Sequence, residues 1–318
     1  MTEDAVAVGI DVGGTKLVAA AIGADGTVID RRRTTTPAPR GDRNRDAAER
    51  LVATIADLAT ELGPGLPVGV GVAGIITRGR LEYSPNLSVV GVPIEQELVS
   101  RLGVPVVVAN DATVAGWGEV CAGAAVGVPD VVMFTLGTGI GGALVLGGRP
   151  VVGTHGFAGE LGHLIVEEGG RACPCGNRGC VEAYASGTAI AAMATEGLSA
   201  TDDPSILRNH ERIDGKAVTE AAHAGDRFAA GILRHAGFWL GVALASAVNA
   251  FDPALVLIGG GAAPGAAEWL LPAARAAMGP RVMGHTHRQL PDVALAALGD
   301  DAGMVGAALL AVSTERLV

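Results

Sequence analysis

Three cysteines lie within one short stretch of the chain, at positions 173, 175 and 180, and His163 lies shortly before them. Three thiolates and one imidazole complete the tetrahedral shell of a structural zinc site. A disulfide would leave one of the three thiols unpaired, and the chain start shows no secretory signal that would favour oxidation. We therefore predict one zinc ion held by His163, Cys173, Cys175 and Cys180, although one residue rather than the common two separates the first pair. Cys121 stands alone and is expected to be a small buried hydrophobe.

A second candidate for chemistry is the pair Asn110-Asp111, which follows an apolar strand expected over 104–109. The carboxyl ends of strands in open α/β sheets face the ligand crevice. A carboxylate there can accept the proton of a hydroxyl that attacks phosphorus. Asn and Asp directly before a helix are also ordinary N-caps, so the dipeptide alone supports both readings.

Two glycine-rich turns could bind phosphate. They are Gly13-Gly14-Thr15-Lys16 and the run 137–142, whose small residues let backbone N–H groups approach phosphate oxygens. Asp11, at the end of the first expected strand, is placed to hold the waters of a Mg²⁺ ion. No Walker-type sequence is present, and the G-x-G-x-x-G match at 137–142 precedes a strand pattern where a dinucleotide site needs a helix.

Glu160 and Glu182 flank the cysteines, and Asn86 lies in a Pro-Asn turn. Carboxylates and amides of this kind can pair with the vicinal hydroxyls of a sugar, and a loop pinned by metal would hold them in place. A Glu in a polar loop usually faces water, and Pro-Asn is ordinary turn chemistry. Both readings stay open for these three residues.

The elements that must position these residues follow an internal repeat. A strand over 6–11, a glycine turn, and apolar runs at 17–22 and 28–29 are matched later by runs at 131–136, 143–146 and 150–152. The pattern favours a duplicated strand–hairpin unit with one phosphate-holding turn per lobe. Further helices are expected over 46–63, 93–102, 113–122, 227–250 and 304–312, and further strands over 68–72, 104–109 and 254–258.

This alternation of strands and helices predicts an α/β fold with largely parallel sheets. At 318 residues the chain is long enough for two lobes. We expect a smaller N-terminal lobe over 1–110, completed by the C-terminal helix at 302–318, and a larger lobe over 111–301 that carries the zinc loop.

The charge and apolar content of the sequence limit the kinds of binding partner that we expect. The formal net charge is -10 and the longest basic run is Arg31-Arg32-Arg33, which is typical of a solvated strand end or loop, so no nucleic-acid partner is expected. The N-terminus is acidic where a signal peptide would be basic, which favours a cytoplasmic protein. The longest apolar stretch, 238–251, is short for a membrane span and is better read as a buried helix, so no membrane partner is expected.

Taken together and in order, these motifs resemble the ROK family of repressors, open reading frames and sugar kinases. The segments that carry the resemblance are Asp11-Val12-Gly13-Gly14-Thr15, Asn110-Asp111, 136–142, Gly159-Glu160-Leu161-Gly162-His163, the Cys173-x-Cys175-Gly176-x-x-Gly179-Cys180-x-Glu182 motif and Gly259-Gly260-Gly261.

The resemblance implies an actin-like (ribonuclease H-like), two-lobed sugar kinase fold that closes around sugar and ATP. It implies Asp111 as the base, with ATP, Mg²⁺ and a structural Zn²⁺ as cofactors and a homo-oligomer, dimer or tetramer, as the assembly. The implied sugar contacts are Asn86, Asn110, Asp111, Glu160, His163 and Glu182. The implied nucleotide contacts are Asp11, Gly13, Gly14, Thr15, Lys16, Gly137, Thr138, Gly139, Gly259, Gly260 and Gly261. His163 would serve twice, with one ring nitrogen on zinc and the other toward the sugar.

Within the resemblance, the C6 hydroxyl of glucose is the first choice of acceptor, ahead of N-acetylmannosamine, mannose and fructose. Many family members carry a tryptophan after the residue that matches Asn86, whereas Leu87 stands here. A sugar-sensing regulator is the alternative from another class, but such regulators carry a DNA-binding segment before the first glycine turn, where this sequence has ten residues before Asp11. Polyphosphate is an alternative phosphate donor.

Overall fold

The computed structural model describes residues 4–37, 43–84, 86–314 and 317, with the side chains of 43–45 left aside. The chain divides into two compact units, which are treated separately below. Unit 1 comprises 1–131, 143–159 and 297–318, and unit 2 comprises 132–142 and 160–296. We expected a boundary near Asn110; the division by contacts falls later and keeps the helix after Asn110 in unit 1, because that helix packs against the C-terminal one.

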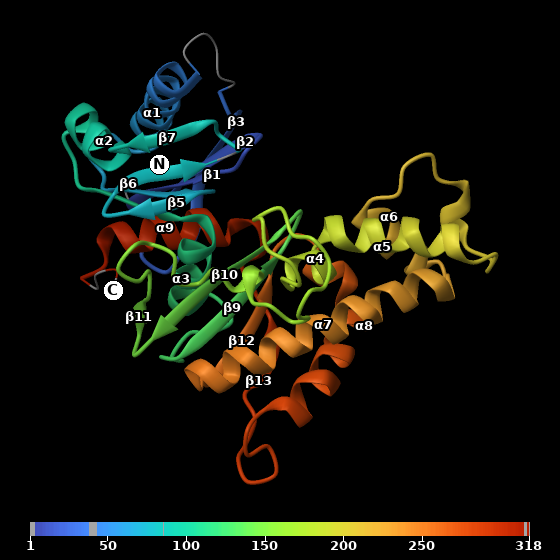
Figure 1. Ribbon diagram of the computed structural model, residues 1–318. Coiled ribbons are helices and arrows are strands. Elements are labelled where there is room, and N and C mark those ends of the chain that lie inside the picture. The colour runs from blue at the N-terminus through green and yellow to red at the C-terminus, as the bar shows by residue number, and fades with distance from the viewer. Residues whose placement is uncertain (1–3, 38–42, 85, 315–316, 318) are drawn as a thin grey trace. The chain divides into compact units, whose positions relative to one another are not determined.

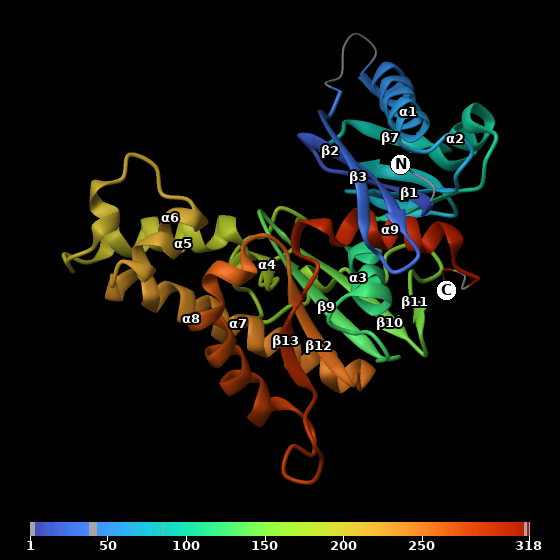
Figure 2. The same ribbon diagram turned by 180° about the vertical axis from the view of Figure 1, so that it is seen from behind.

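The helices expected from the sequence are present, and the structure adds others, among them those at 187–200, 215–223 and 263–278 (Figures 1 and 2). The strands are β1 (Ala5–Val12), β2 (Lys16–Gly23), β3 (Val28–Thr35), β4 (Val68–Val72), β5 (Ile75–Thr77), β6 (Arg80–Ser84), β7 (Val89–Val92), β8 (Val106–Asn110), β9 (Val131–Leu136), β10 (Ile140–Leu146), β11 (Arg149–Pro150), β12 (Leu255–Gly259) and β13 (Asp292–Leu295). The α-helices are α1 (Arg43–Leu62), α2 (Ile94–Leu102), α3 (Asp111–Ala122), α4 (Glu182–Ala185), α5 (Gly187–Ala200), α6 (Gly215–His223), α7 (Arg227–Phe251), α8 (Ala263–Met278) and α9 (Ala302–Val312).

The sheet of unit 1 has the strand order β3-β2-β1-β4-β8. β1, β4 and β8 are parallel, whereas β2 and β3 continue from β1 as antiparallel strands. The carboxyl ends of the three parallel strands therefore share one edge. The sequence placed Asp11 and Asn110-Asp111 at strand ends, and this topology brings those ends to neighbouring positions.

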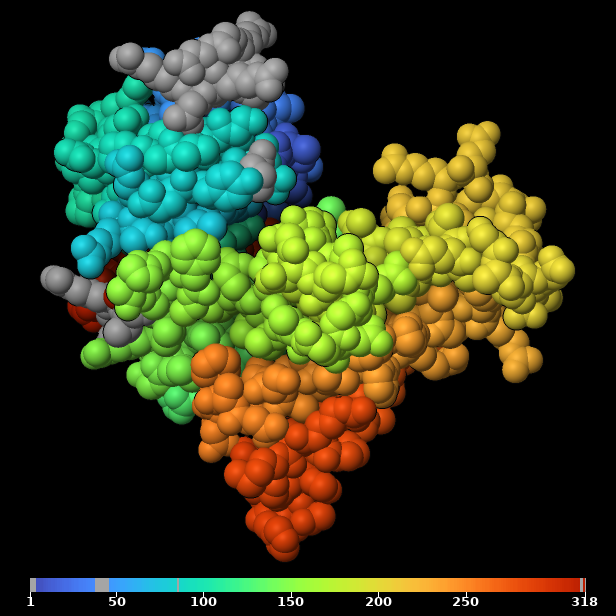
Figure 3. Space-filling view, viewed as in Figure 1, coloured from blue at the N-terminus to red at the C-terminus, as the bar shows by residue number. Residues whose placement is uncertain are grey.

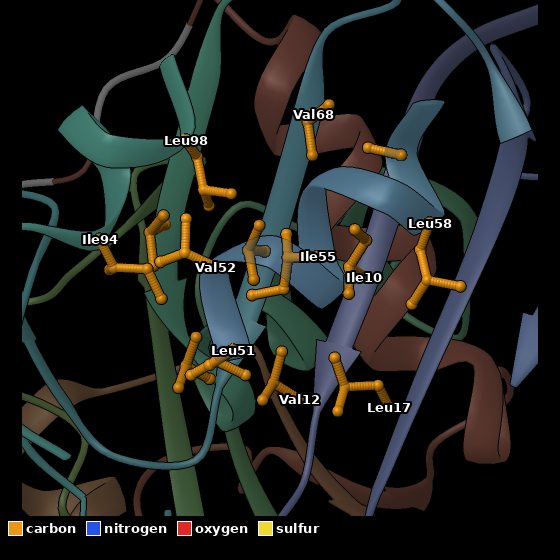
Figure 4. Close-up of a cluster of buried hydrophobic side chains, with 14 of the residues drawn as sticks. Ile10, Val12, Leu17, Leu51, Val52, Ile55, Leu58, Val68, Ile94 and Leu98 are labelled. Atoms are coloured by element: carbon orange, nitrogen blue, oxygen red, sulfur yellow. The ribbon is translucent and has the colours of Figure 1, made fainter. Parts of the chain in front are cut away.

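Helices cover both faces of this sheet. Ile10 and Val12 point to the face where Leu51 and Ile55 of α1 pack, in the apolar cluster of Figure 4. The other face carries α9, because Met304, Val305 and Ala308 pack with Ala7 and Ile22. The alternation of the strand residues between two apolar layers explains why these strands read as nearly continuous apolar runs.

Charged side chains lie at both edges of this sheet. β3 presents Arg31, Arg32 and Arg33 to solvent, so the basic run lies within a strand and is solvated as expected. At the opposite edge, the Glu95 carboxylate accepts a hydrogen bond of 3.0 Å from the N–H of Val108 in β8.

Three short strands form a sheet of their own in the order β5-β6-β7. The sequence does not predict these strands. Each has five residues or fewer, and their apolar positions are too few to show a period. β5 and β6 carry the chain from the end of β4 to the Asn86 turn, and β7 leads from that turn to α2.

The second sheet has the order β11-β10-β9-β12-β13. In unit 2, β12 and β13 are parallel, and α7 packs along α8. Of the described helices, α7 alone is long and apolar enough to cross a membrane by length and composition, and 56% of its most apolar stretch is buried within the protein. Its buried residues include Leu233, Leu240 and Leu244, in keeping with the interior helix expected from the sequence.

Helices α3 and α9 cross at glycines. A Cβ atom on Gly306 would lie 1.7 Å from the Val114 carbonyl oxygen, and one on Gly118 would lie 2.7 Å from the Ala302 carbonyl oxygen. No side chain fits at either position without separating the helices.

We therefore expect Gly306→Ala to destabilise the protein by about 1–3 kcal/mol or more, as overpacking does. Urea unfolding monitored by circular dichroism measures the change. The matched control is Gly231→Ala on the exposed side of α7, where an added Cβ meets no atom within 4 Å and should be neutral or stabilising. Equal stability of the two variants would contradict this account of the crossing.

Candidate functional site

Two carboxylates lie at the shared strand edge of unit 1. Asp11 is the penultimate residue of β1, and Asp111 directly follows β8. Burial raises the pKa of Asp11 to about 6, and the negative charges of Asp111 and Asp300 add to the rise while Lys16 opposes it. The two carboxylates are therefore close enough to affect one another, with one lysine as the neighbouring cation.

Asn110, rather than Asp111, caps helix α3. Its side-chain oxygen accepts hydrogen bonds from the N–H groups of Ala112 (2.9 Å) and Thr113 (3.1 Å). Its amide nitrogen donates to the Gly74 carbonyl at 3.1 Å, just beyond β4. The amide thereby ties the start of α3 to the neighbouring strand, and the capping role that the dipeptide left open belongs to Asn110.

Asp111 is the first residue of α3 and remains partly accessible. One carboxylate oxygen accepts from the N–H of Ala112 at 2.9 Å. Burial raises the pKa of Asp111, against the lowering effect of that hydrogen bond and of Asn110. A carboxylate with a raised pKa is a better proton acceptor, which is the property that a general base needs.

The first glycine turn is held from both sides. The N–H of Gly13 donates to the Lys16 carbonyl at 3.0 Å, and the Thr36 hydroxyl donates to the Gly13 carbonyl at 2.7 Å. Thr15 and Lys16 are exposed. A Cβ atom on Gly14 would lie 3.0 Å from the Cβ of Asn86, so the structure brings Asn86 against this turn.

In unit 2 the predicted zinc ligands converge. The ligand atoms of His163, Cys173, Cys175 and Cys180 all lie within 4.8 Å of one another. The sulfur atoms of Cys175 and Cys180 are 3.7 Å apart, and the Cys173 sulfur is 3.8 Å from Nδ1 of His163. Two sulfurs bound tetrahedrally at about 2.3 Å from one zinc lie about 3.8 Å apart, so the residues fit the ion. Burial raises the pKa of the Cys173 and Cys180 thiols, which a bound cation would offset.

The other ring nitrogen of His163 faces a carboxylate. Its Nε2 lies 3.8 Å from an oxygen of Glu160, three residues earlier in the chain. This places Glu160 where it can orient the imidazole, as partners of metal-bound histidines do. The expectation that Nε2 also reaches a sugar stays a prediction.

Glu182 contacts both the zinc cluster and the second glycine turn. One carboxylate oxygen accepts from the N–H of Ile140 at 2.8 Å, and the other lies 3.7 Å from the Cys173 sulfur. A Cβ atom on Gly139 would lie 2.4 Å from Glu182, so only glycine leaves room for the carboxylate. On the face shown in Figure 3, the loop that carries the cysteines (yellow-green) runs into the surface of α5 and α6 (yellow).

The glycines after β12 lie against the end of β9. The Ala262 N–H donates to the Leu136 carbonyl at 3.1 Å, and a Cβ atom on Gly260 would lie 2.3 Å from the same oxygen. The run 259–261 and the turn that follows Leu136 therefore neighbour one another in unit 2.

The predicted residues thus gather into two sets. Unit 1 holds Asp11, the turn 13–16, Asn86, Asn110 and Asp111; unit 2 holds Gly137, Thr138, Gly139, Glu160, His163, the three cysteines, Glu182 and the run 259–261. Asp300, whose charge acts on Asp11, was not predicted from the sequence. An acidic pair before a helix looks like ordinary capping, so no sequence signal pointed to it.

The chain is similar to known proteins over nearly its whole length. The model of the ROK family matches residues 7–314. A glucokinase of Streptomyces coelicolor is 33% identical, over 98% of this chain and 99% of that protein. An N-acetylmannosamine kinase of Citrobacter koseri is 36% identical, over 95% of this chain and 97% of that protein. The crystal structure of a ROK family glucokinase from Streptomyces griseus, in complex with glucose and AMPPNP, superposes with a TM-score of 0.80 at 35% identity, covering 95% of this chain and 97% of that one.

The chain belongs to the ROK family. Its fold is the actin-like, ribonuclease H-like two-lobed α/β fold of ROK sugar kinases, as the sequence motifs implied.

We expect about one zinc ion per chain in the purified protein, and loss of that ion in Cys175→Ser, because three ligands no longer complete the shell. Elemental analysis by mass spectrometry measures the metal. Cys121→Ser is the matched control, since Cys121 lies outside the ligand cluster and its replacement should leave the zinc content unchanged. Folded wild-type protein without zinc would refute the site.

Proposed function

We propose that the protein is an ATP-dependent hexose kinase that phosphorylates the C6 hydroxyl of glucose, with Asp111 as the general base. The observation that carries the proposal is the partly accessible Asp111 carboxylate, with its raised pKa, at the strand edge beside Asp11. The sugar kinases among its relatives, matched over nearly the whole chain, support the same reaction class.

In this mechanism the oxygen of the sugar hydroxyl attacks the terminal phosphorus of ATP, and Asp111 accepts the proton of that hydroxyl. The bond between the terminal phosphorus and the oxygen that leaves with ADP breaks. Asp11 would hold waters of a Mg²⁺ ion, which when bound neutralises charge on the phosphates. The hydrogen bonds of Asn110 fix the start of α3, so the base has one position relative to β4. General base catalysis of this kind contributes about 10²–10⁴-fold.

The remaining contacts draw on residues of both units. We propose that the sugar is held by Asn86, Asn110, Glu160, His163 and Glu182, and the nucleotide by the turn 13–16, by Gly137, Thr138 and Gly139, and by the run 259–261. Carboxylates and amides suit vicinal hydroxyls, and the backbone N–H groups of glycine turns suit phosphates.

A second acceptor has its own support. An N-acetylmannosamine kinase is 36% identical to this chain, between the 33% and 37% found for two glucokinases, and Leu87 stands where many family members carry tryptophan. N-acetylmannosamine is therefore the alternative sugar. We further propose a cytoplasmic homo-oligomer that binds neither nucleic acid nor membrane, in line with the net charge of -10.

The direct test is a coupled ADP-release assay over glucose, N-acetylmannosamine, mannose and fructose, with ATP as donor and a parallel phosphate-transfer assay with polyphosphate. We expect the highest kcat/KM with glucose and ATP. A higher value with N-acetylmannosamine would establish the alternative, and no transfer to any of these sugars would contradict the kinase proposal.

Asp111→Asn should lower kcat by about 10²-fold or more while the affinity for sugar stays largely intact, because the amide keeps the shape but cannot take the proton. Steady-state kinetics and calorimetric titration with sugar measure the two effects. The control is Asp57→Asn, an exposed acid on α1, which should leave both unchanged. Turnover close to wild type in Asp111→Asn would remove Asp111 from the role of base.

A further inference from the structure

The second glycine turn, residues 137–140, has a distinct pattern of hydrogen bonds. Its carbonyl groups are bound by the start of α5: the N–H of Gly187 donates to the Gly137 carbonyl at 2.8 Å, and the Thr188 hydroxyl donates to the Thr138 carbonyl at 2.8 Å. The Thr188 N–H reaches the same Thr138 oxygen at 3.4 Å. The first donors of α5, which helices usually leave to caps or water, are thus used on the turn.

The amide groups of the turn divide into two kinds. The Gly137 N–H donates to the Gly139 carbonyl at 3.0 Å, and the Ile140 N–H donates to the Glu182 carboxylate at 2.8 Å. The N–H groups of Thr138 and Gly139, at the tip, have no acceptor within the part of the chain that the structure describes. Those are the donors that remain for an anion.

We propose that Glu182 and Thr188 are positioning residues for the phosphate-binding turn. Thr188 binds the Thr138 carbonyl and Glu182 binds the Ile140 amide, while the Gly187 N–H binds the Gly137 carbonyl. Held in this way, the turn keeps its Thr138 and Gly139 amides available for the nucleotide phosphates. The proposal deepens the proposed function and rests on it, because it assigns the turn to ATP.

The geometry explains why this segment follows the zinc loop at once. Glu182 comes two residues after Cys180, and Ser186 caps α5 by accepting from the Ala189 N–H at 3.1 Å. The Ser186 cap leaves the two amides before Ala189 free for the turn. The partial positive charge at the start of α5 also lies behind a turn that would carry phosphate, which favours the anion.

Thr188 gives the cleaner test, because Glu182 is also a candidate sugar contact. Thr188→Val removes the hydroxyl donor and keeps the shape of the side chain. It should raise the KM for ATP about three- to tenfold, which is the effect expected from the loss of one ordinary hydrogen bond, and leave the KM for sugar unchanged. Thr188→Ser keeps the hydroxyl and should restore the wild-type KM for ATP.

Thr195→Val on the same helix is the matched control. The Thr195 side chain is likewise exposed, but its hydroxyl donates to the Ala191 carbonyl of its own helix at 2.9 Å. It should leave the KM for ATP unchanged.

Hydrogen exchange of the free protein supplies a readout that needs no nucleotide. Peptides that cover 137–140 should exchange faster in Thr188→Val than in Thr195→Val or wild type. Equal exchange and equal KM for ATP in the two valine variants would overturn the positioning role. A wild-type protein that neither binds an ATP analogue nor transfers phosphate would overturn the proposed function instead. In that case, faster exchange in Thr188→Val would still show that the Thr188 hydroxyl stabilises the turn.

Discussion

The close packing of helix α9 on the sheet of unit 1 is the constraint on which the strand edge with Asp11 and Asp111 depends. Cβ atoms on Gly9 and Gly69 would lie 1.8 Å from carbonyl oxygens of α9, so glycine in the strands lets the helix backbone rest on the sheet. The same helix brings Gly303 against Asp11, where an added Cβ would lie 3.0 Å from the carboxyl carbon. Packing that stabilises the unit therefore also removes water from Asp11, and that burial is the main cause of its raised pKa.

In unit 2, the backbone around the cysteines would be fixed by metal ligands, whereas in unit 1 it is fixed by helix packing. A polar loop with many glycines and few apolar side chains has little means of holding one shape. A zinc ion bound by His163 and the three cysteines would provide that means, and Glu182 would extend the order from the cysteines to the glycine turn. In both units, a carboxylate is placed by backbone that has been fixed for another reason.

The sequence predicted much of the site because its residues stand at the ends of strongly apolar strands. Asp11 and Asp111 lie where the strand ends led us to expect them, and the cysteine spacing predicted the ligand cluster. The sequence could not predict which of Asn110 and Asp111 caps α3, because both residue types are good caps and the choice depends on where Gly74 lies. The roles of Asp300 and Thr188 depend on interactions with segments that are distant in the sequence. Short strands such as β5 have too few residues to show an alternation of apolar and polar side chains.

The charged edges of the first sheet have a consequence for the protein in a crowded solution. A sheet that ends in bare backbone can recruit a strand from another molecule and so begin an aggregate. Here one border exposes three consecutive arginines, and charged side chains on an edge strand discourage the pairing of another strand. At the other border the carboxylate of Glu95 already occupies the Val108 amide that an incoming strand would need. Growth of the sheet by added strands is thereby disfavoured on both sides, which lets a chain with 49% hydrophobic residues keep a long apolar sheet in water.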